Sequence, residues 1–300
     1  MPKFVPWNSQ PLDAWAERYA AGAFIDLAGR STHYIEKGEG PPLILLHGFF
    51  YDSYLWAQNV DTLAREFKVY VPDLWGFGYS TREPMDYGYA LYAEQVRLFM
   101  DGLGIERAVL AGQSMGGGTA VKFCVAHRAR VEKLLLVAPA GMPNPMPWVG
   151  KFFALPGVGE YFLSRSTDAV RKSNLKRVFL HRRETLTPAY FENVTRHHKI
   201  KGTTESSLAV LRNDFFDKLG EEIDMLGTMD VPSLIVWGRE DKAIPVDRGK
   251  RMQRVLTGSR LEIVDGAGHA LNSECPGQFN RLALGFLGAD RCLAGPGRGL

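Results

Sequence analysis

The chain has 300 residues, of which 45% are hydrophobic and 23% are charged. These proportions are typical of a folded globular protein and exclude a disordered, collagen-like or low-complexity chain. The net charge of +3 is well below that of a typical nucleic-acid-binding protein, so no nucleic acid is expected among the partners. No apolar run reaches the roughly 18 residues that cross a bilayer, so a membrane span is not expected.

The beginning of the chain, Met1–Trp7, is too polar and too interrupted by proline for a signal peptide. The three cysteines, Cys124, Cys275 and Cys292, are odd in number and share no metal-ligand spacing. A disulfide framework is therefore not expected, and a reducing cytoplasm is the predicted location.

Six short apolar runs, each bounded by turn residues, alternate with helical segments. Such runs indicate strands buried on both faces, and the alternation indicates a mostly parallel, doubly wound sheet. They are Leu43–Leu46, Val69–Val71, Ala108–Ala111, Leu134–Val137, Ser233–Trp237 and Leu261–Val264. Alternating residues over Phe24–Leu27 and Thr32–Ile35 predict an antiparallel hairpin at one edge, which brings the sheet to about eight strands.

Apolar residues at three- and four-residue spacing predict the helices between these strands. They are Trp56–Glu66, Tyr89–Leu103, Met115–His127, Val246–Val255 and Gln278–Leu287.

The alternation stops at Gly141–Pro147 and resumes at Val231. The stretch between them has no strand-like run, and its pattern favours helices over Ser166–Leu180, Pro188–His198 and Glu205–Leu219. We therefore expect residues 142–227 to form an all-helical cap, inserted into a core made of residues 1–141 and 228–289. The glycine-rich end, residues 290–300, is expected to be a flexible tail.

The strongest chemical signal is Gly112-Gln113-Ser114-Met115-Gly116, which fits the pattern G-x-S-x-G. It directly follows a predicted strand and opens a predicted helix, which is the context this motif requires. A sharp strand-to-helix turn strains the serine backbone, and the flanking glycines leave no Cβ to collide in that turn. The helix N-terminus beneath the hydroxyl offers N–H groups to an oxyanion. Ser114 is therefore a candidate nucleophile.

With this motif the chain resembles the α/β-hydrolase family over nearly its whole length. The resemblance depends on four segments in order: His47–Phe50, Asp73–Ser80, the serine motif, and Gly238–Asp241 with Gly266–His269. The family order of nucleophile, acid and histidine implies a triad of Ser114, Asp241 and His269. Histidine suits the role of base because its pKa lies near neutrality, and the aspartate would orient the ring and stabilise its charged form.

Three other carboxylates compete for the role of acid: Glu240, Asp247 and Asp265. The family pattern selects Asp241, which lies three residues after the glycine that ends its strand. The resemblance also implies that the backbone N–H groups of Phe49 and Met115 form the oxyanion hole. No cofactor and no metal ion are expected. The adjacent His197 and His198 do not share a helix face, and no carboxylate completes a site with them, so a solvated surface is the favoured interpretation.

The cap is rich in large apolar side chains, and these predict an apolar acyl pocket together with Phe49, Phe50 and Tyr51. They are Met142, Met146, Trp148, Phe152, Phe153, Leu155, Phe162, Phe179, Phe215 and Phe216. The favoured function is therefore hydrolysis of carboxylic esters with small to medium acyl chains, through an acyl-enzyme intermediate, with a small-molecule ester as the substrate.

Three alternatives remain open. The segment Ser114-Met115-Gly116-Gly117 also resembles the C–C bond hydrolases of aromatic degradation, although Ala270 and the Phe49-Phe50-Tyr51 loop depart from that group. A cofactor-free haloperoxidase or perhydrolase would use the same triad, and a non-catalytic receptor could keep it. Between Lys151 and Lys201 the chain holds 11 Lys and Arg against four acids, which is typical of a solvated surface, an anionic substrate site or docking to anionic lipid.

Overall fold

The computed structural model of the chain describes residues 5–143, 145–146, 148–213 and 218–288. Eight strands form one sheet in the order β1-β2-β4-β3-β5-β6-β7-β8. The pairs β1–β2 and β2–β4 are antiparallel and the other pairs are parallel, which confirms the predicted sheet and its edge hairpin. The strands are β1 (Ala23–Leu27), β2 (Arg30–Lys37), β3 (Pro42–Leu46), β4 (Lys68–Pro72), β5 (Ala108–Gln113), β6 (Val131–Val137), β7 (Ser233–Gly238) and β8 (Arg260–Val264).

The helices outside the cap are α1 (Leu12–Tyr19), α2 (Val60–Leu63), α3 (Tyr89–Gly102), α4 (Met115–Ala126), α10 (Gly220–Gly227), α11 (Asp247–Val255), α12 (Leu271–Glu274) and α13 (Pro276–Gly288). Four of them follow the prediction, namely α3, α4, α11 and α13, whereas α1, α10 and α12 were not predicted there. The helix expected over Trp56–Glu66 is a 3₁₀ turn, Ser53–Trp56, followed by the single turn α2. Helix α1 was not predicted, although Pro11 immediately precedes it and Asp13 lies in its first turn.

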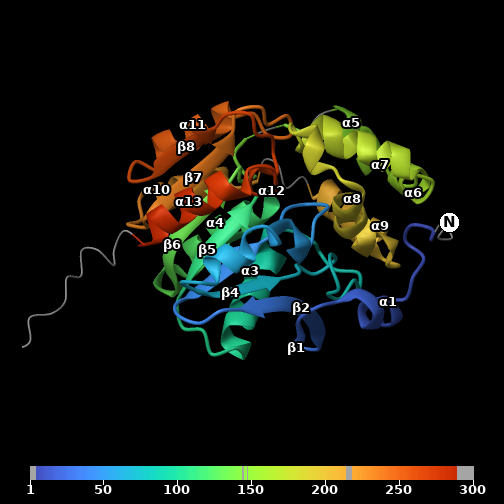
Figure 1. The fold of residues 1–300 in the computed structure, drawn as a ribbon, viewed down its shortest axis with the longest axis horizontal. Coiled ribbons are helices and arrows are strands. Elements are labelled where there is room, and N and C mark those ends of the chain that lie inside the picture. Colours follow the sequence, from blue (N-terminus) through green and yellow to red (C-terminus); the bar gives the residue numbers. More distant parts are fainter. Residues whose placement is uncertain (1–4, 144, 147, 214–217, 289–300) are drawn as a thin grey trace, which may run out of the picture.

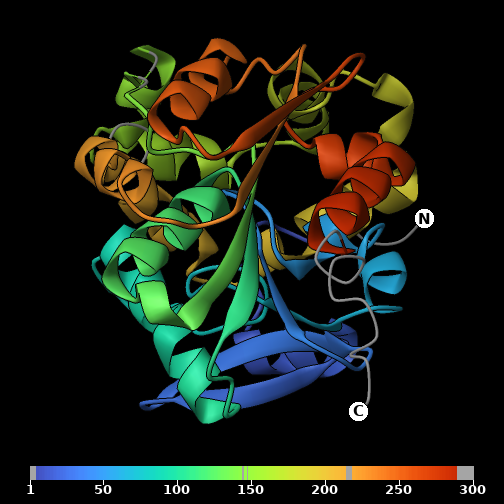
Figure 2. The same cartoon turned by 90° about the vertical axis from the view of Figure 1, so that its left-hand side faces the viewer.

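Alternate side chains of the central strands enter two separate hydrophobic cores. In β3, Ile44 and Leu46 belong to the core that contains side chains of α3 and α4. Leu43 and Leu45 belong to the core that contains side chains of α13. Burial on both faces explains why these strands appear in the sequence as continuous apolar runs. Figure 2 shows the central strands between the green helices on one side and the red α13 on the other.

The described residues between β6 and β7 are mainly helical, and none of them adds a strand to the sheet. Their helices α5 to α9 gather at one end of the molecule in Figure 1, and we call α5–α9 the cap helices. They are α5 (Trp148–Ala154), α6 (Val158–Ser164), α7 (Asp168–Asn174), α8 (Pro188–Arg196) and α9 (Thr203–Arg212). A π-helical turn, Leu175–Phe179, follows α7.

The cap boundaries at residues 142 and 227 stay a prediction. Helix α10 packs against α4 and α11, which favours grouping it with the sheet domain. The expected flexible tail, residues 290–300, and Cys292 within it lie outside the described residues, whereas Cys124 and Cys275 are buried free thiols.

Candidate active site

Ser114 occupies the sharp turn between β5 and α4, as the sequence predicted. Its φ of 52° and ψ of −118° lie in a region that non-glycine residues rarely adopt. Strain of this kind costs about 1–3 kcal/mol and persists only where the surrounding structure enforces it. The backbone on both sides of the turn is fixed by hydrogen bonds, because the Ser114 N–H donates to the Val137 carbonyl and the Gly118 N–H donates to the Ser114 carbonyl.

The glycines of the motif are required by close packing. A Cβ at Gly112 would lie 2.3 Å from the Gly116 carbonyl oxygen, and one at Gly116 would lie 2.3 Å from the Leu46 carbonyl oxygen. Both contacts involve backbone atoms, which cannot move aside as a flexible side chain could. The pattern G-x-S-x-G therefore follows from how tightly α4 approaches the ends of β3 and β5.

His269 and Asp241 form a buried pair. The Nδ1 atom of His269 lies 2.7 Å from Oδ2 of Asp241, and both side chains are almost fully buried. The other oxygen, Oδ1 of Asp241, accepts the backbone N–H groups of Ala243 and Ile244 at 2.8 and 2.9 Å. This arrangement fixes the carboxylate and places the proton of a neutral ring on Nδ1. Nε2 of His269 is then available to accept a proton.

The three competing carboxylates have other partners. Glu240 accepts the Ala267 N–H at 3.1 Å, Asp247 pairs with Lys250 on the surface, and Asp265 pairs with Arg239. The carboxylate that lies at hydrogen-bond distance from the His269 ring is Asp241, which supports the predicted choice of acid.

The histidine loop lies next to the serine turn. Gln113, which precedes Ser114, donates from Nε2 to the His269 carbonyl at 3.0 Å. Ser114 is 4% exposed and His269 is 2% exposed, and Phe179 lies against the His269 ring, so both residues are buried in this structure. Asp241 and His269, which follow β7 and β8, are therefore paired directly, and Ser114, which follows β5, lies in the turn next to the histidine loop. The catalytic roles of the three residues stay a prediction.

The two predicted oxyanion donors follow neighbouring strands. Phe49 comes after β3 and Met115 begins α4 after β5, and these strands pair in parallel with Leu46 opposite Gly112. A Cβ at Gly48 would lie 3.1 Å from the Ser114 Cβ, so the backbone before Phe49 packs directly on Ser114. Both predicted donors thus follow paired strands beside Ser114, and their role in an oxyanion hole stays a prediction.

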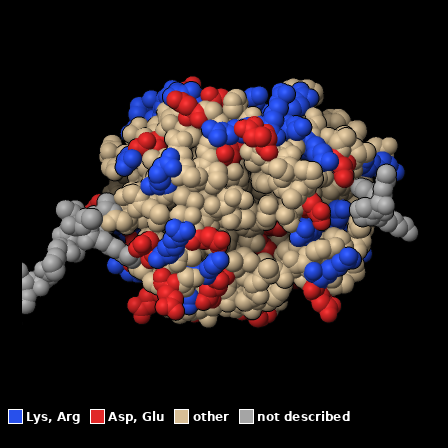
Figure 3. Space-filling model, viewed as in Figure 1, with Lys and Arg blue, Asp and Glu red and all other residues tan. Residues whose placement is uncertain are grey.

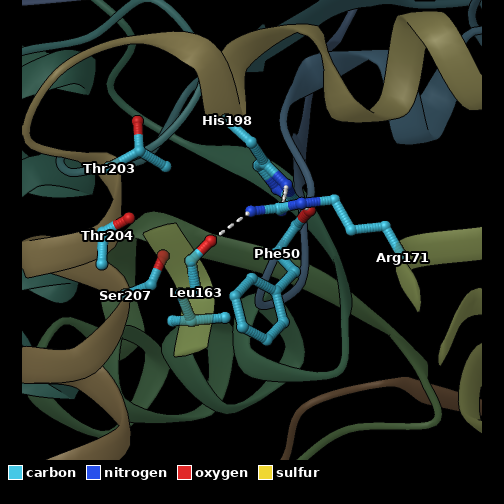
Figure 4. Close-up of a pocket in the computed structure, with 7 residues that line it drawn as sticks. All are labelled: Phe50, Leu163, Arg171, His198, Thr203, Thr204 and Ser207. Carbon is cyan, nitrogen blue, oxygen red and sulfur yellow. Dashed lines mark hydrogen bonds between the residues drawn. The ribbon is translucent and has the colours of Figure 1, made fainter. Parts of the chain in front are cut away.

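Phe50, the next residue, has a strained backbone that a cap histidine holds in place. Its φ is +64°, and its carbonyl accepts Nε2–H of His198 at 3.0 Å. Nδ1 of His198 in turn accepts from the Arg171 guanidinium at 2.8 Å (Figure 4). Burial and the nearby Arg171 lower the pKa of His198 to about 3, so the ring is neutral and its Nε2 proton is directed at the loop. The cavity between these residues measures about 10 Å³, room for about one water molecule and not for a substrate.

The surface location expected for His197 and His198 is wrong, because both rings are buried. His197 lies against Phe77, and His198 bonds the Phe50 carbonyl. His33, in β2, is buried as well: Nδ1 lies 2.7 Å from Asp73 and Nε2 lies 2.6 Å from the Ala21 carbonyl. With two acceptors both ring nitrogens carry protons. Burial lowers the pKa of His33, but Asp73 and the Ala21 carbonyl together raise it above its ordinary value.

Asp73 ties this histidine to the loop that follows the predicted oxyanion donor. Its Oδ1 accepts the Ser53 N–H at 2.7 Å, and its Oδ2 accepts from His33 and the Tyr79 N–H. The neighbouring Asp52 is buried beside it and accepts the Tyr54 N–H at 3.0 Å. Burial and the charge of Asp73 raise the pKa of Asp52 to about 8. The segment Asp73–Ser80, which was expected to be structural, thus holds the loop that follows Phe49 through the bond from Ser53 to Asp73.

Glu274 joins the cap to the histidine loop and was not found from the sequence. One carboxylate oxygen accepts the N–H groups of His181 and Arg182 at 2.7 Å each, and the other accepts the Gly268 N–H at 2.9 Å. The N–H of His269 itself donates to the Phe179 carbonyl at 2.9 Å. Burial raises the pKa of Glu274. A glutamate two residues before a proline gives no sequence signal for such contacts.

The predicted acyl pocket is partly wrong. Met142 and Met146 are buried, and the Phe179 ring lies 5.9 Å from the His269 ring. Four of the other predicted lining residues are exposed instead: Trp148, Phe152, Leu155 and Phe162. Phe215 and Phe216 lie outside the described residues.

Within the part of the chain that the structure describes, no group of three or more His, Cys, Asp or Glu side chains is arranged to hold a metal ion. None of the described helices is long and apolar enough to cross a bilayer.

Known hydrolases resemble this chain. A 2-hydroxy-6-oxo-6-phenylhexa-2,4-dienoate hydrolase of Comamonas testosteroni is 31% identical over 280 residues, which cover 87% of this chain and 93% of that protein. A solved meta-cleavage product hydrolase of Pseudomonas fluorescens superposes with a TM-score of 0.78 at 26% identity, over 90% of this chain and 98% of that one. A Bacillus subtilis carboxylesterase superposes with a TM-score of 0.76 at 26% identity, over 92% and 95% of the two chains.

Residues 41–276 match the family described as the alpha/beta hydrolase fold. This range contains the serine turn, the buried His269–Asp241 pair and the segment that holds the cap helices. The chain therefore belongs to the α/β-hydrolase family and is a hydrolase.

Proposed function

We propose that this protein hydrolyses a C–C bond in a 2-hydroxy-6-oxo-dienoate, using Ser114, His269 and Asp241. The observation that carries the proposal is the 31% identity to a dienoate hydrolase over nearly the full length of both chains. The superposition on a meta-cleavage product hydrolase at 26% identity supports it. This order reverses the expectation from the sequence alone, which favoured esters.

The proposed chemistry needs a nucleophile, a base and oxyanion donors. His269 Nε2 takes the proton of the Ser114 hydroxyl, and the serine oxygen bonds to the C6 carbonyl carbon. Backbone N–H groups of Phe49 and Met115 stabilise the oxyanion. An electron pair left on C5 of the dienol would not be stabilised, so the substrate first shifts its C2 hydroxyl proton to C5 and reacts as the 2,6-diketo tautomer. The C5–C6 bond then breaks with its electron pair delocalised onto the C2 oxygen as a dienolate, and this oxygen takes the proton from His269. Water hydrolyses the acyl-serine, so the net reaction adds one water and yields a carboxylic acid and a 2-hydroxydienoate.

Hydrolysis of carboxylic esters is the second candidate. Ala270 follows the histidine and the Phe49-Phe50-Tyr51 loop follows β3, which are the two departures from the C–C hydrolases noted in the sequence. The Phe179 ring beside His269 also provides an apolar wall that suits an acyl chain. The carboxylesterase at 26% identity is consistent with this alternative.

A comparison of two substrate classes separates the candidates. The purified protein is assayed on a 2-hydroxy-6-oxo-6-phenyl dienoate, followed by loss of its visible absorbance, and on p-nitrophenyl butanoate. We expect kcat/KM for the dienoate to exceed that for the ester by at least about 100-fold. An ester preference would favour the second candidate. In either case Ser114→Ala should abolish turnover while the folded structure is kept, and a variant that retains full activity would remove the proposed nucleophile.

A further inference from the structure

The exposed large hydrophobic side chains of this protein are concentrated in three cap helices and the turn that follows them. Among the described residues ten such side chains are exposed, and eight of them lie between residues 148 and 178. We call these eight the cap apolar patch: Trp148, Val149, Phe152, Leu155, Tyr161, Phe162, Val170 and Val178. Exposed apolar residues scattered singly are ordinary, whereas a concentration on one region marks an interaction site.

The helices that carry the patch pack against the rest of the cap with their other residues. Helices α5 and α6 both pack against α9. Their aromatic rings also contact one another, with the Phe152 and Phe162 centroids 6.1 Å apart and the Tyr161 and Phe162 centroids 5.4 Å apart. Trp148, at the start of α5, is 78% exposed. The rings of Phe152, Tyr161 and Phe162 thus form one cluster, and each of them is between 43% and 54% exposed.

Basic residues alternate with this patch along the chain. Residues 148–180 contain six of them: Lys151, Arg165, Arg171, Lys172, Lys176 and Arg177. Arg171 is turned inward to His198, which leaves five for an outside partner. The same segment has two acids, Glu160 and Asp168, and Glu160 is paired with Arg212 at 2.8 Å. Arg165 lies over the Tyr161 ring at 4.2 Å. In Figure 3 blue side chains lie beside uncharged surface at the upper right, where Figure 1 places α5 and α7.

We propose that the cap apolar patch docks on the surface of an anionic phospholipid bilayer. Trp, Tyr and Phe rings with Leu and Val insert at the level of the headgroups, and the flanking Lys and Arg residues bind lipid phosphates. A second copy of the chain fits less well, because a twofold contact would bring like-charged faces together. Lysine is also depleted at protein–protein interfaces, whereas this face has three lysines. The proposal does not depend on the substrate.

Vesicle sedimentation tests the proposal with the full chain. Vesicles of phosphatidylcholine alone are compared with vesicles that contain about one-third phosphatidylglycerol. We expect the partition coefficient to be at least about tenfold higher on the anionic vesicles and to fall about tenfold when salt rises from about 0.05 to 0.5 M.

Two pairs of matched variants locate the surface. Trp148→Ala/Phe152→Ala should weaken binding about tenfold, whereas Phe24→Ala/Met225→Ala, which removes two exposed apolar side chains elsewhere, should not. Arg165→Glu/Arg177→Glu should abolish the preference for anionic vesicles, whereas Arg251→Glu/Arg254→Glu on α11 should keep it.

Three results would overturn the proposal. The first is no vesicle binding by the wild type. The second is equal loss in the cap variants and their controls. The third is a dimer in solution that the Trp148→Ala/Phe152→Ala variant loses, which would assign the patch to a second copy of the chain. Turnover of the dienoate and the ester is measured in parallel without vesicles, so failure of docking and failure of the proposed reaction are seen separately.

Discussion

At the scale of single residues, the two carboxylate oxygens of Asp241 have different hydrogen-bond partners. Oδ1 accepts two backbone N–H groups and Oδ2 faces Nδ1 of His269. In Asp241→Asn the amide oxygen is retained by the two N–H donors, so the amide NH₂ faces the ring. The ring must then accept at Nδ1 and carry its proton on Nε2, where it cannot act as a base. We expect kcat to fall by about 10³- to 10⁴-fold with little loss of stability.

The adjacent carboxylate provides the control for that experiment. Glu240 accepts the Ala267 N–H rather than a group of the triad, so Glu240→Gln should keep most of the activity. Rates on the preferred substrate and thermal melts measure both variants. If Glu240→Gln is the more impaired of the two, Asp241 is not the catalytic acid.

The raised pKa of Asp52 leads to a prediction about how the stability of the fold depends on pH. Its pKa in the folded protein is raised to about 8, above the value of about 4 expected when the chain is unfolded. Between these values the folded protein holds a proton that the unfolded chain releases. The free energy of unfolding therefore decreases as pH rises, by at most about 1.4 kcal/mol per pH unit. The substitution Asp52→Asn keeps an acceptor for the Tyr54 N–H and removes the titration.

Asp52→Asn should thus gain stability relative to the wild type as pH rises from 5 to 8. Chemical denaturation at both pH values measures the gain. The control is Asp61→Asn, because Asp61 is exposed and pairs with Lys37 on the surface. A gain that is equal at the two pH values would show that Asp52 is ionised throughout.

Ser114, Asp241 and His269 lie at the strand ends where the sequence placed them, whereas His197 and His198 are buried against expectation, for a physical reason. Ser114, Asp241 and His269 follow the ends of strands, and the position of a strand end can be read from an apolar run and its turn residues. Whether His33 or His198 is buried depends on partners that are 40 and 148 residues away in the chain, Asp73 and Phe50. No local pattern reports such a pairing.

At the scale of elements, the loop after β3 depends on a contact from the cap. The neutral His198 holds the carbonyl of Phe50, which has a strained φ of +64°. Loss of this bond would let the loop relax and displace the predicted oxyanion donor Phe49. A misplacement of about 1 Å can cost about 100-fold in rate, so His198→Ala should lower kcat by about 10- to 100-fold with KM nearly unchanged.

His198→Gln tests whether the hydrogen bond is the cause. Its side-chain amide N–H can replace the Nε2–H donor to the Phe50 carbonyl, so it should recover most of the lost kcat. His181→Ala, which removes an exposed cap histidine, should be close to wild type. Steady-state kinetics separate the two effects. Equal losses of kcat in the Ala and Gln variants, or a loss confined to stability, would refute the positioning role.

The strands could be predicted better than the cap helices. A buried strand is recorded in the sequence by its own residues, as in β7, where every residue is buried. The helix expected over Ser166–Leu180 is instead α7 followed by a π-helical turn, and Leu175 and Leu180 are its buried positions. Short cap helices gain their stability from packing, which periodicity alone does not show.

At the scale of the whole molecule, two consecutive parts of the cap segment make different contacts. The segment Phe179–Arg182 is bonded to the histidine loop through Glu274 and through the Phe179 carbonyl. Helices α5 to α7 present the cap apolar patch to solvent instead. The sequence showed that this segment is rich in large apolar side chains, but it could not tell which of them face the site, because the direction of a helix face is set by what it packs on.

This difference leads to a prediction for Glu274. The three N–H groups that it accepts belong to both the cap and the loop of His269, and each unsatisfied buried donor costs about 1–3 kcal/mol. In Glu274→Gln the amide oxygen can accept the N–H groups of His181 and Arg182, but the amide NH₂ then faces the Gly268 N–H. Either the bond to the histidine loop or the bonds to the cap are therefore lost. We expect the free energy of unfolding to fall by about 1–3 kcal/mol and kcat to fall with it.

Hydrogen exchange should accelerate both at residues 179–182 and at residues 266–270, whereas Glu262→Gln, on the edge strand β8, should change neither segment. Faster exchange in the cap segment alone, with the histidine loop and kcat unaffected, would show that the cap and the catalytic loop are not coupled through this carboxylate.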